Sequence, residues 1–170
     1  MKHLISVFTV AALLSALACN KVDKELINKM QGDLAAMEGT AVVAEKASTT
    51  LANLATQMNA APEAMKSGDN PELKSLMEKS GMMSKKLQAT MAEYNDLMSK
   101  LKTLVADYNA GKIKTEDAKK EYETLSEGLK GSSSMLSNMA SASDQIQTAF
   151  AKMTADWNAK AEGAAPPAGK

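Results

Sequence analysis

The sequence predicts an all-α protein, built as an antiparallel up-down-up three-helix bundle with long, coiled-coil-like helices. Along three long segments, apolar residues recur at spacings that alternate between three and four, which is typical of helices that share one core. Only two short clusters of breaker residues separate the segments, so consecutive helices are expected to run in opposite directions. Aromatic residues make up only 4% of the 170 residues, and a core of Ala, Leu, Met and Val suits closely packed helices.

The first helix is expected over about residues 22–59. Its apolar seam consists of Ile27, Met30, Leu34, Met37, Ala41, Ala44, Ser48, Leu51, Ala55 and Met58, flanked by Leu26, Val43 and Leu54. The middle of this seam carries only Ala and Ser, so the helices there either approach closely or leave a groove.

The second helix is expected over about residues 71–108. Residues 60–70 contain Gly68 and Asn70, which suit a turn. Asn70 is expected to cap the helix, with Pro71 at the first helical position, where a missing N–H is harmless. The predicted seam consists of Leu73, Met77, Ser80, Ser84, Leu87, Met91, Tyr94, Met98, Leu101, Val105 and Tyr108.

The third helix is expected over about residues 115–158, so that the bundle occupies residues 19–160. Gly111 fits a C-cap of the second helix and Thr115 an N-cap of the third. The predicted seam consists of Ala118, Tyr122, Leu125, Leu129, Ser132, Leu136, Met139, Ser143, Ile146, Phe150, Met153 and Trp157. Residues 161–170 are rich in Gly, Ala and Pro, which predicts a disordered tail.

The N-terminal segment predicts export from the cytoplasm. A positive start at Lys2 precedes an apolar stretch over residues 4–14 and then small residues, the pattern of a secretory signal peptide. The following Ser15-Ala16-Leu17-Ala18-Cys19 resembles the lipobox of bacterial lipoproteins. The resemblance implies that residues 1–18 are a signal peptide and that Cys19 becomes the lipidated N-terminus.

A lipid on Cys19 implies attachment to a membrane of the bacterial cell envelope. Asn20 follows this cysteine in place of the Asp that retains enteric lipoproteins at the inner membrane, so the analogy favours the outer membrane. The charged run over residues 21–25 resembles the surface-export tethers of some Gram-negative phyla. The sequence therefore leaves two alternatives for the location of the protein, the periplasmic face and the outer surface of the envelope.

Composition argues against nucleic-acid binding and against catalysis. The 20 basic residues are balanced by 20 acidic residues, which leaves no excess charge to neutralise phosphates. Removal of the signal peptide removes His3, lipid blocks Cys19, and the chain has no Arg. Triad catalysis and the usual zinc sites need these groups. We therefore expect no enzyme activity and no cofactor other than the covalent lipid.

Methionine is abundant, with 13 residues. Most of them fall on the seams, where a flexible thioether fills gaps in a core. The methionines off the seams are Met65, Met82, Met83 and Met135. Of these, Met82 and Met83 are weak candidates for binding a soft metal such as Cu(I).

Two residues near the C-terminus are candidates for contact with a partner, Trp157 and Lys170. A lipidated cysteine, a long helical seam and a final Lys170 together resemble, loosely and in plan, the Braun-type murein lipoprotein, whose terminal lysine is joined to peptidoglycan. The expected role is structural or in protein interaction, with an envelope protein or peptidoglycan as the partner. The alternative is a periplasmic carrier or sensor of a hydrophobic ligand or soft metal.

Overall fold

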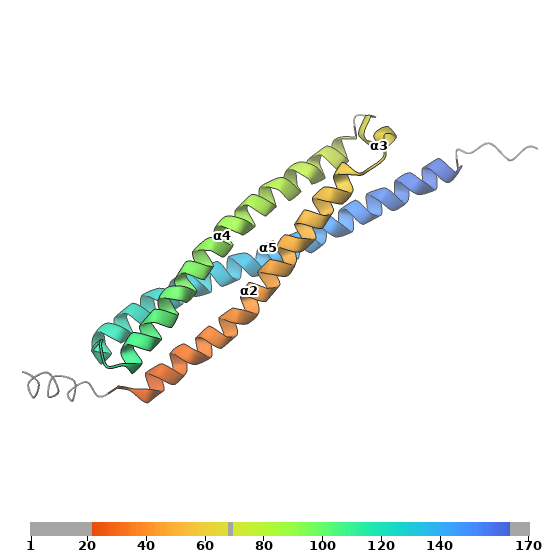
Figure 1. The fold of residues 1–170 in the computed structure, drawn as a ribbon. Coiled ribbons are helices and arrows are strands. Elements are labelled where there is room, and N and C mark those ends of the chain that lie inside the picture. Colours follow the sequence, from red (N-terminus) through yellow and green to blue (C-terminus); the bar gives the residue numbers. More distant parts are fainter. Residues whose placement is uncertain (1–21, 68–69, 164–170) are drawn as a thin grey trace, which may run out of the picture. The chain divides into compact units, whose positions relative to one another are not determined.

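The computed structural model describes residues 22–67 and 70–163, and this part of the chain is all-helical (Figure 1). Helix accounts for 92% of it, without a strand. The four helices are α2 (Lys24–Asn59), α3 (Glu63–Ser67), α4 (Pro71–Asn109) and α5 (Thr115–Gly163). The predicted all-α class is therefore confirmed for these residues.

Side-chain caps define where α2 and α4 begin. Asp23 Oδ1 accepts hydrogen bonds from the backbone N–H groups of Glu25 at 3.0 Å and Leu26 at 3.2 Å. This cap makes Lys24 the first residue of α2, two residues later than predicted. At α4, Asn70 Oδ1 accepts a bond from Leu73 N at 3.2 Å, which confirms the predicted cap.

The turn between α4 and α5 is a Schellman motif centred on Gly111. Lys112 N donates to Asp107 O at 3.0 Å, and Gly111 N donates to Tyr108 O at 2.9 Å, which is the bond pair of that motif. Gly111 has φ +70°, a conformation that is open to glycine without strain. The predicted C-cap role of Gly111 is thus confirmed.

The start of α5 differs from the prediction in its cap. The helix begins at Thr115 as expected, but its first backbone bond runs from Ala118 N to Lys114 O at 2.9 Å. Lys114 therefore occupies the capping position and Thr115 the first helical position. The Thr115 hydroxyl lies 3.0 Å from the Tyr108 hydroxyl instead.

Two further segments are more helical than predicted. Residues 63–67, expected to be part of a turn, form α3, whose first turn is closed by a bond from Met65 N to Pro62 O at 2.8 Å. At the other end, α5 continues beyond the predicted Asn158 to Gly163. Residues 159–162 are Ala, Lys, Ala and Glu, which have high helix propensity. The predicted disordered tail is therefore wrong for residues 161–163.

The helices contribute to two compact units. We call the first unit the part formed by the described residues up to Gly39 together with Glu93–Ser133. The second unit is formed by the described residues of Thr40–Ala92 together with those from Ser134 onward. Each of the three long helices gives one part of its length to each unit, while α3 belongs to the second unit alone.

The predicted seam of α5 is confirmed as the buried face of that helix, with every member from Ala118 to Met153 buried and Trp157 partly buried. The seams of α2 and α4 are shifted in places. Leu76 is buried where Met77 was expected, and Leu54 is buried where Ala55 was expected. Residues seven apart on the same seams, such as Leu51 and Met58 or Leu73 and Ser80, are buried as predicted, so each shift is confined to the position between them.

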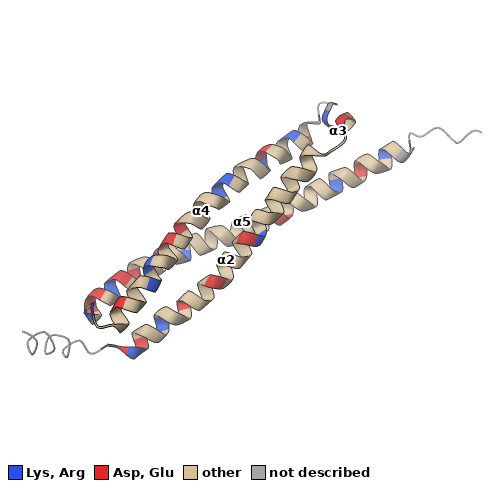
Figure 2. Ribbon diagram, in the orientation of Figure 1, with Lys and Arg blue, Asp and Glu red and all other residues tan. Residues whose placement is uncertain are grey.

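Charged residues of both signs are interspersed along α4 and α5 (Figure 2). Two stretches of the second unit are nearly free of them. Residues 47–59 of α2 carry no charged residue, and residues 134–151 of α5 carry only Asp144. The surface of these stretches is therefore built from small, polar and apolar side chains.

Candidate functional site

The first unit is held together by buried tyrosines that form hydrogen bonds between different parts of the chain. The Tyr94 hydroxyl donates to Met37 O at 3.0 Å, which joins α4 to α2. The Tyr108 hydroxyl accepts a bond from Asp23 N at 2.7 Å, at the start of α2. Both rings are 1% exposed, so they act as core anchors, as predicted.

Tyr122 connects α5 to α2 through a carboxylate. Its hydroxyl donates to Asp33 Oδ2 at 2.5 Å, and the Lys29 ammonium lies 5.3 Å from the centre of its ring. Burial raises the pKa of Tyr122 to about 12, and the hydrogen bond to Asp33 acts in the same direction. Both effects favour the neutral phenol.

A polar cleft of about 380 Å³ adjoins Tyr122 in the first unit. Its charged lining consists of Asp23, Glu25, Lys29, Lys119 and Glu123. Lys119 lies 3.7 Å from Asp23, so part of this charge is neutralised within the cleft. Because the lining carries both charges, it favours neither an anionic nor a cationic ligand.

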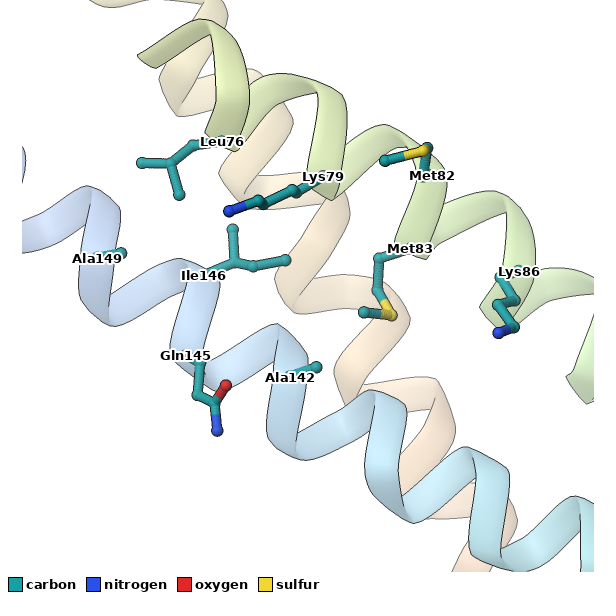
Figure 3. Close-up of a pocket in the computed structure, with 9 residues that line it drawn as sticks. All are labelled: Leu76, Lys79, Met82, Met83, Lys86, Ala142, Gln145, Ile146 and Ala149. Atoms are coloured by element: carbon teal, nitrogen blue, oxygen red, sulfur yellow. The ribbon is translucent and has the colours of Figure 1, made fainter. Parts of the chain in front are cut away.

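The second unit contains a larger and mainly apolar groove between α4 and α5, with a volume of about 430 Å³ (Figure 3). Figure 3 shows Leu76 and Met83 of α4 pointing toward α5, and Ile146 of α5 pointing toward α4. Ala142 and Ala149 line the α5 side. Because alanine side chains are short, they leave the space that longer residues would fill.

A second groove, of about 340 Å³, lies between α2 and α4 in the same unit. Met77, Ser80 and Ser84 of α4 line it opposite Leu51 and Ala55 of α2. Of these, Ser80 and Ser84 are small-residue positions of the predicted α4 seam. Residues 76–86 of α4 therefore line one groove on each side of that helix.

Exposed large apolar side chains are confined to the second unit among the residues that the structure describes. They are Val42, Val43, Met77, Met82 and Met135, with exposed fractions of 39% to 66%. Large apolar residues that remain exposed in this way are typical of binding surfaces when they gather in one region. We therefore take the second unit, with its two grooves, as the candidate functional site.

The structure corrects two predictions about methionine. Met77 was placed on the α4 seam but is 39% exposed and lines the α2/α4 groove. Met65 was placed off the seams but is only 1% exposed, because α3 turns its side chain into the core. Met82 and Met83 both line the α4/α5 groove, with Met82 66% exposed.

The other predicted site residues are placed in different ways. Trp157 lies on α5 and is partly buried, outside both grooves. Cys19 and Lys170 lie outside the described residues, as does the signal peptide. The described residues contain no group of three or more Cys, His, Asp or Glu side chains placed to hold a metal ion.

Sequence reasoning missed the α4/α5 groove. The available signal was the placement of Lys79, Met82, Met83 and Lys86 off the seam of α4, at positions three and four apart that share one helix face.

Residues 22–67 and 70–163 include no helix with both the length and the apolar character needed to cross a bilayer. Comparison of the chain with protein-family models, curated proteins and solved structures gives no match.

Proposed function

We propose that the protein is a bacterial lipoprotein with a structural or protein-interaction role in the cell envelope. Lipid on Cys19 would anchor it, most simply in the outer membrane, and α2, α4 and α5 would form an up-down-up three-helix bundle. The observation that carries the interaction role is the confinement of the exposed large apolar side chains to the second unit. An enzyme activity is not part of the proposal.

Chain connectivity supports an anchor next to the first unit. Asp23 is four positions after Cys19 in the chain, and an extended chain of this length spans about 14 Å at most. Asp23 is held by Tyr108, so a lipidated Cys19 would keep this end of the first unit near the bilayer surface.

The anchor is tested by fractionating cells that produce the protein and two variants. The unchanged protein is expected in the outer membrane, with acyl chains on the Cys19 peptide by mass spectrometry. Cys19→Ser should leave the membrane fraction, whereas Asn20→Asp, the matched neighbour, should keep the lipid and move to the inner membrane. Membrane association of the Cys19→Ser variant would contradict the proposed anchor.

The interaction role is tested with a photo-cross-linking amino acid at Met82 in the second unit and, as the matched control, at the exposed Lys130 in the first unit. We expect one defined envelope protein or a muropeptide to be linked from Met82 and not from Lys130. Trp157 and Lys170 are further positions for the probe, because they are the proposed contacts of the C-terminal region. Equal labelling from both units would contradict a binding role for the second unit.

A second candidate function is a carrier of a hydrophobic ligand, which the two grooves beside α4 favour. Their volumes, about 430 and 340 Å³, fall at the lower end of the range for small-molecule sites. The protein purified from its own cells should then contain an apolar ligand, and its removal should lower the melting temperature. A soft metal held by Met82 and Met83 is a weaker form of this candidate, tested by titration with Cu(I).

A further inference from the structure

We infer that the α4/α5 groove of the second unit binds a single-chain aliphatic carboxylate, that is, a long-chain fatty acid. The inference rests on the carrier function proposed above and names the ligand class and the residues that select it. The aliphatic chain would lie along the apolar lining, and the carboxylate would pair with Lys79 or Lys86.

The charge of the groove favours an anion. Lys79 and Lys86 line it, and no acidic residue does. Neither ammonium forms an ion pair within the described residues. The acids nearest in sequence are Glu78, adjacent to Lys79, and Asp144, adjacent to the lining Gln145. An uncompensated positive rim beside an apolar surface is complementary to an amphipathic anion.

The two lysines place positive charge inside the groove and at one of its ends. They are seven residues apart on α4, which corresponds to about 10.5 Å along the helix axis. Figure 3 shows Lys86 at one end of the lining and Lys79 inside it, with Leu76 and Ala149 at the other end. The apolar residues between them, Met83 and Ala142, provide the surface for methylene groups.

The lining suits a flexible chain better than a rigid planar ligand. Met82 and Met83 are unbranched and adjust to the shape of a ligand. No aromatic residue lines the groove, so ring stacking has no partner. The polar cleft of the first unit is the internal contrast, because its lysines share their lining with Asp23, Glu25 and Glu123.

The test uses the purified full chain in a nonionic detergent and two photoactivatable probes. One is palmitic acid with a mid-chain diazirine, and the other is the corresponding hexadecanol, which has no charge. We expect the acid to label peptides that contain residues 76–86 and 142–149. The alcohol should label them more weakly, because it lacks the ion pair.

Variants then separate the apolar lining from the charged rim. Ala142→Leu with Ala149→Leu should fill the groove and abolish labelling, whereas Ala151→Leu with Ala155→Leu, at exposed α5 positions, should not. Lys79→Gln with Lys86→Gln should lower labelling by the acid by up to about fivefold, from the loss of one partly screened ion pair. Lys74→Gln with Lys152→Gln, the same change of charge at exposed sites outside the groove, is the control. Circular dichroism checks that each variant is folded.

Each contrary result has a distinct meaning. Equal labelling by acid and alcohol would overturn the selection of a carboxylate while leaving the carrier function standing. Labelling that persists in the filled groove would place the ligand elsewhere and overturn the site. Labelling by neither probe would overturn this inference. The carrier function would be overturned as well if the protein purified from its own cells also contained no apolar ligand, and the lipid anchor is tested separately by fractionation.

Discussion

The two units are built from the same three helices but are stabilised in different ways. In the first unit, tyrosine hydroxyls join α2 to α4 and α5, and the ion pair between Lys102 and Glu38, at 3.3 Å, adds a surface link. In the second unit, the polar links between helices are weaker. Ser143 Oγ lies 3.5 Å from Ala47 O, and Asn70 Nδ2 lies 3.9 Å from the sulfur of Met153.

The difference extends to the surface. The methionines that the structure describes in the first unit, Met30, Met37 and Met98, are all buried. The second unit leaves Met77, Met82 and Met135 exposed and contains both apolar grooves. Directional hydrogen bonds fix one packing arrangement, whereas small and flexible side chains leave space that a ligand or partner can occupy. The first unit is therefore suited to maintaining a fixed structure, and the second unit is suited to binding.

Truncation of one core leucine in each unit should give the largest effects. Leu101→Ala in the first unit should cost about 3 to 5 kcal/mol, because Leu101 is fully buried and its neighbours are fixed. Leu51→Ala in the second unit should cost about 2 to 3 kcal/mol, because Leu51 borders a groove into which neighbours can relax. Urea unfolding followed by circular dichroism measures both. Equal losses of unfolding free energy in the two variants would contradict the proposed difference in packing between the units.

Removal of the Tyr122 hydroxyl should weaken the first unit in a pH-dependent way. Tyr122→Phe loses a hydrogen bond to a carboxylate, at a cost of about 2 kcal/mol near neutral pH. The raised pKa, about 12 against 10.0, means that the neutral phenol stabilises the fold fully below pH 10. This contribution is lost as the pH rises from 10 to 12, because the unfolded chain releases the proton first.

The check is a series of unfolding free energies between pH 8 and 12. Tyr94→Phe is the matched control, since its hydroxyl meets a backbone carbonyl and its loss should cost about 1 kcal/mol. The part of the alkaline decline that is due to Tyr122 should disappear in Tyr122→Phe and persist in Tyr94→Phe. Identical alkaline profiles in the two variants would contradict the raised pKa of Tyr122.

Two glycines of α5 provide a smaller, stabilising test of packing in the first unit. Gly131→Ala should raise the free energy of unfolding by up to about 1 kcal/mol, because a methyl group there meets open space within a helix. Gly128→Ala should gain less, since its Cβ would lie 3.3 Å from Leu97 Cδ1 and the leucine must move. Thermal melting of the two variants gives the comparison. A larger gain at position 128 would show that this contact adjusts without cost.

Mild oxidation should mark the second unit and leave the unfolding free energy almost unchanged. Peroxide should convert Met82 and Met135 to sulfoxides faster than Met30 and Met58, because the first pair is exposed and the second pair is fully buried. Peptide mass spectrometry over a time course measures each rate. Uniform oxidation of all four residues would mean that the buried pair becomes accessible, which would contradict the described packing.

Local sequence signals accounted for most of the helical structure. Asn70 with Pro71 started α4 as predicted, and Gly111 ended it. The α5 seam from Ala118 to Met153 was predicted residue by residue, because its apolar residues are large and regularly spaced. Where seam residues were small or ambiguous, as at Ala55 and Met77, the pattern placed the buried face one residue away.

The candidate site was less accessible to sequence reasoning. Met82 and Met83 were predicted as weak candidates for a metal site, and the small residues in the middle of the first seam were expected to give close packing or a groove. The sequence did not distinguish these outcomes, because a groove depends on what the facing helix offers. Ala142 and Ala149 of α5 leave space opposite Met83, and this pairing is a property of the packed unit.

The sequence by itself determined the helical class, the positions of the major turns and the polar-apolar division of each helix, because these depend on neighbours within a few residues. It also determined the expectation of a lipidated Cys19. Only the tertiary structure decided that Met65 is buried through α3, that the Tyr122 hydroxyl meets Asp33, and that residues 76–86 of α4 border two grooves. These features depend on contacts between residues far apart in the chain, and no local pattern specifies which distant side chain will face a given residue.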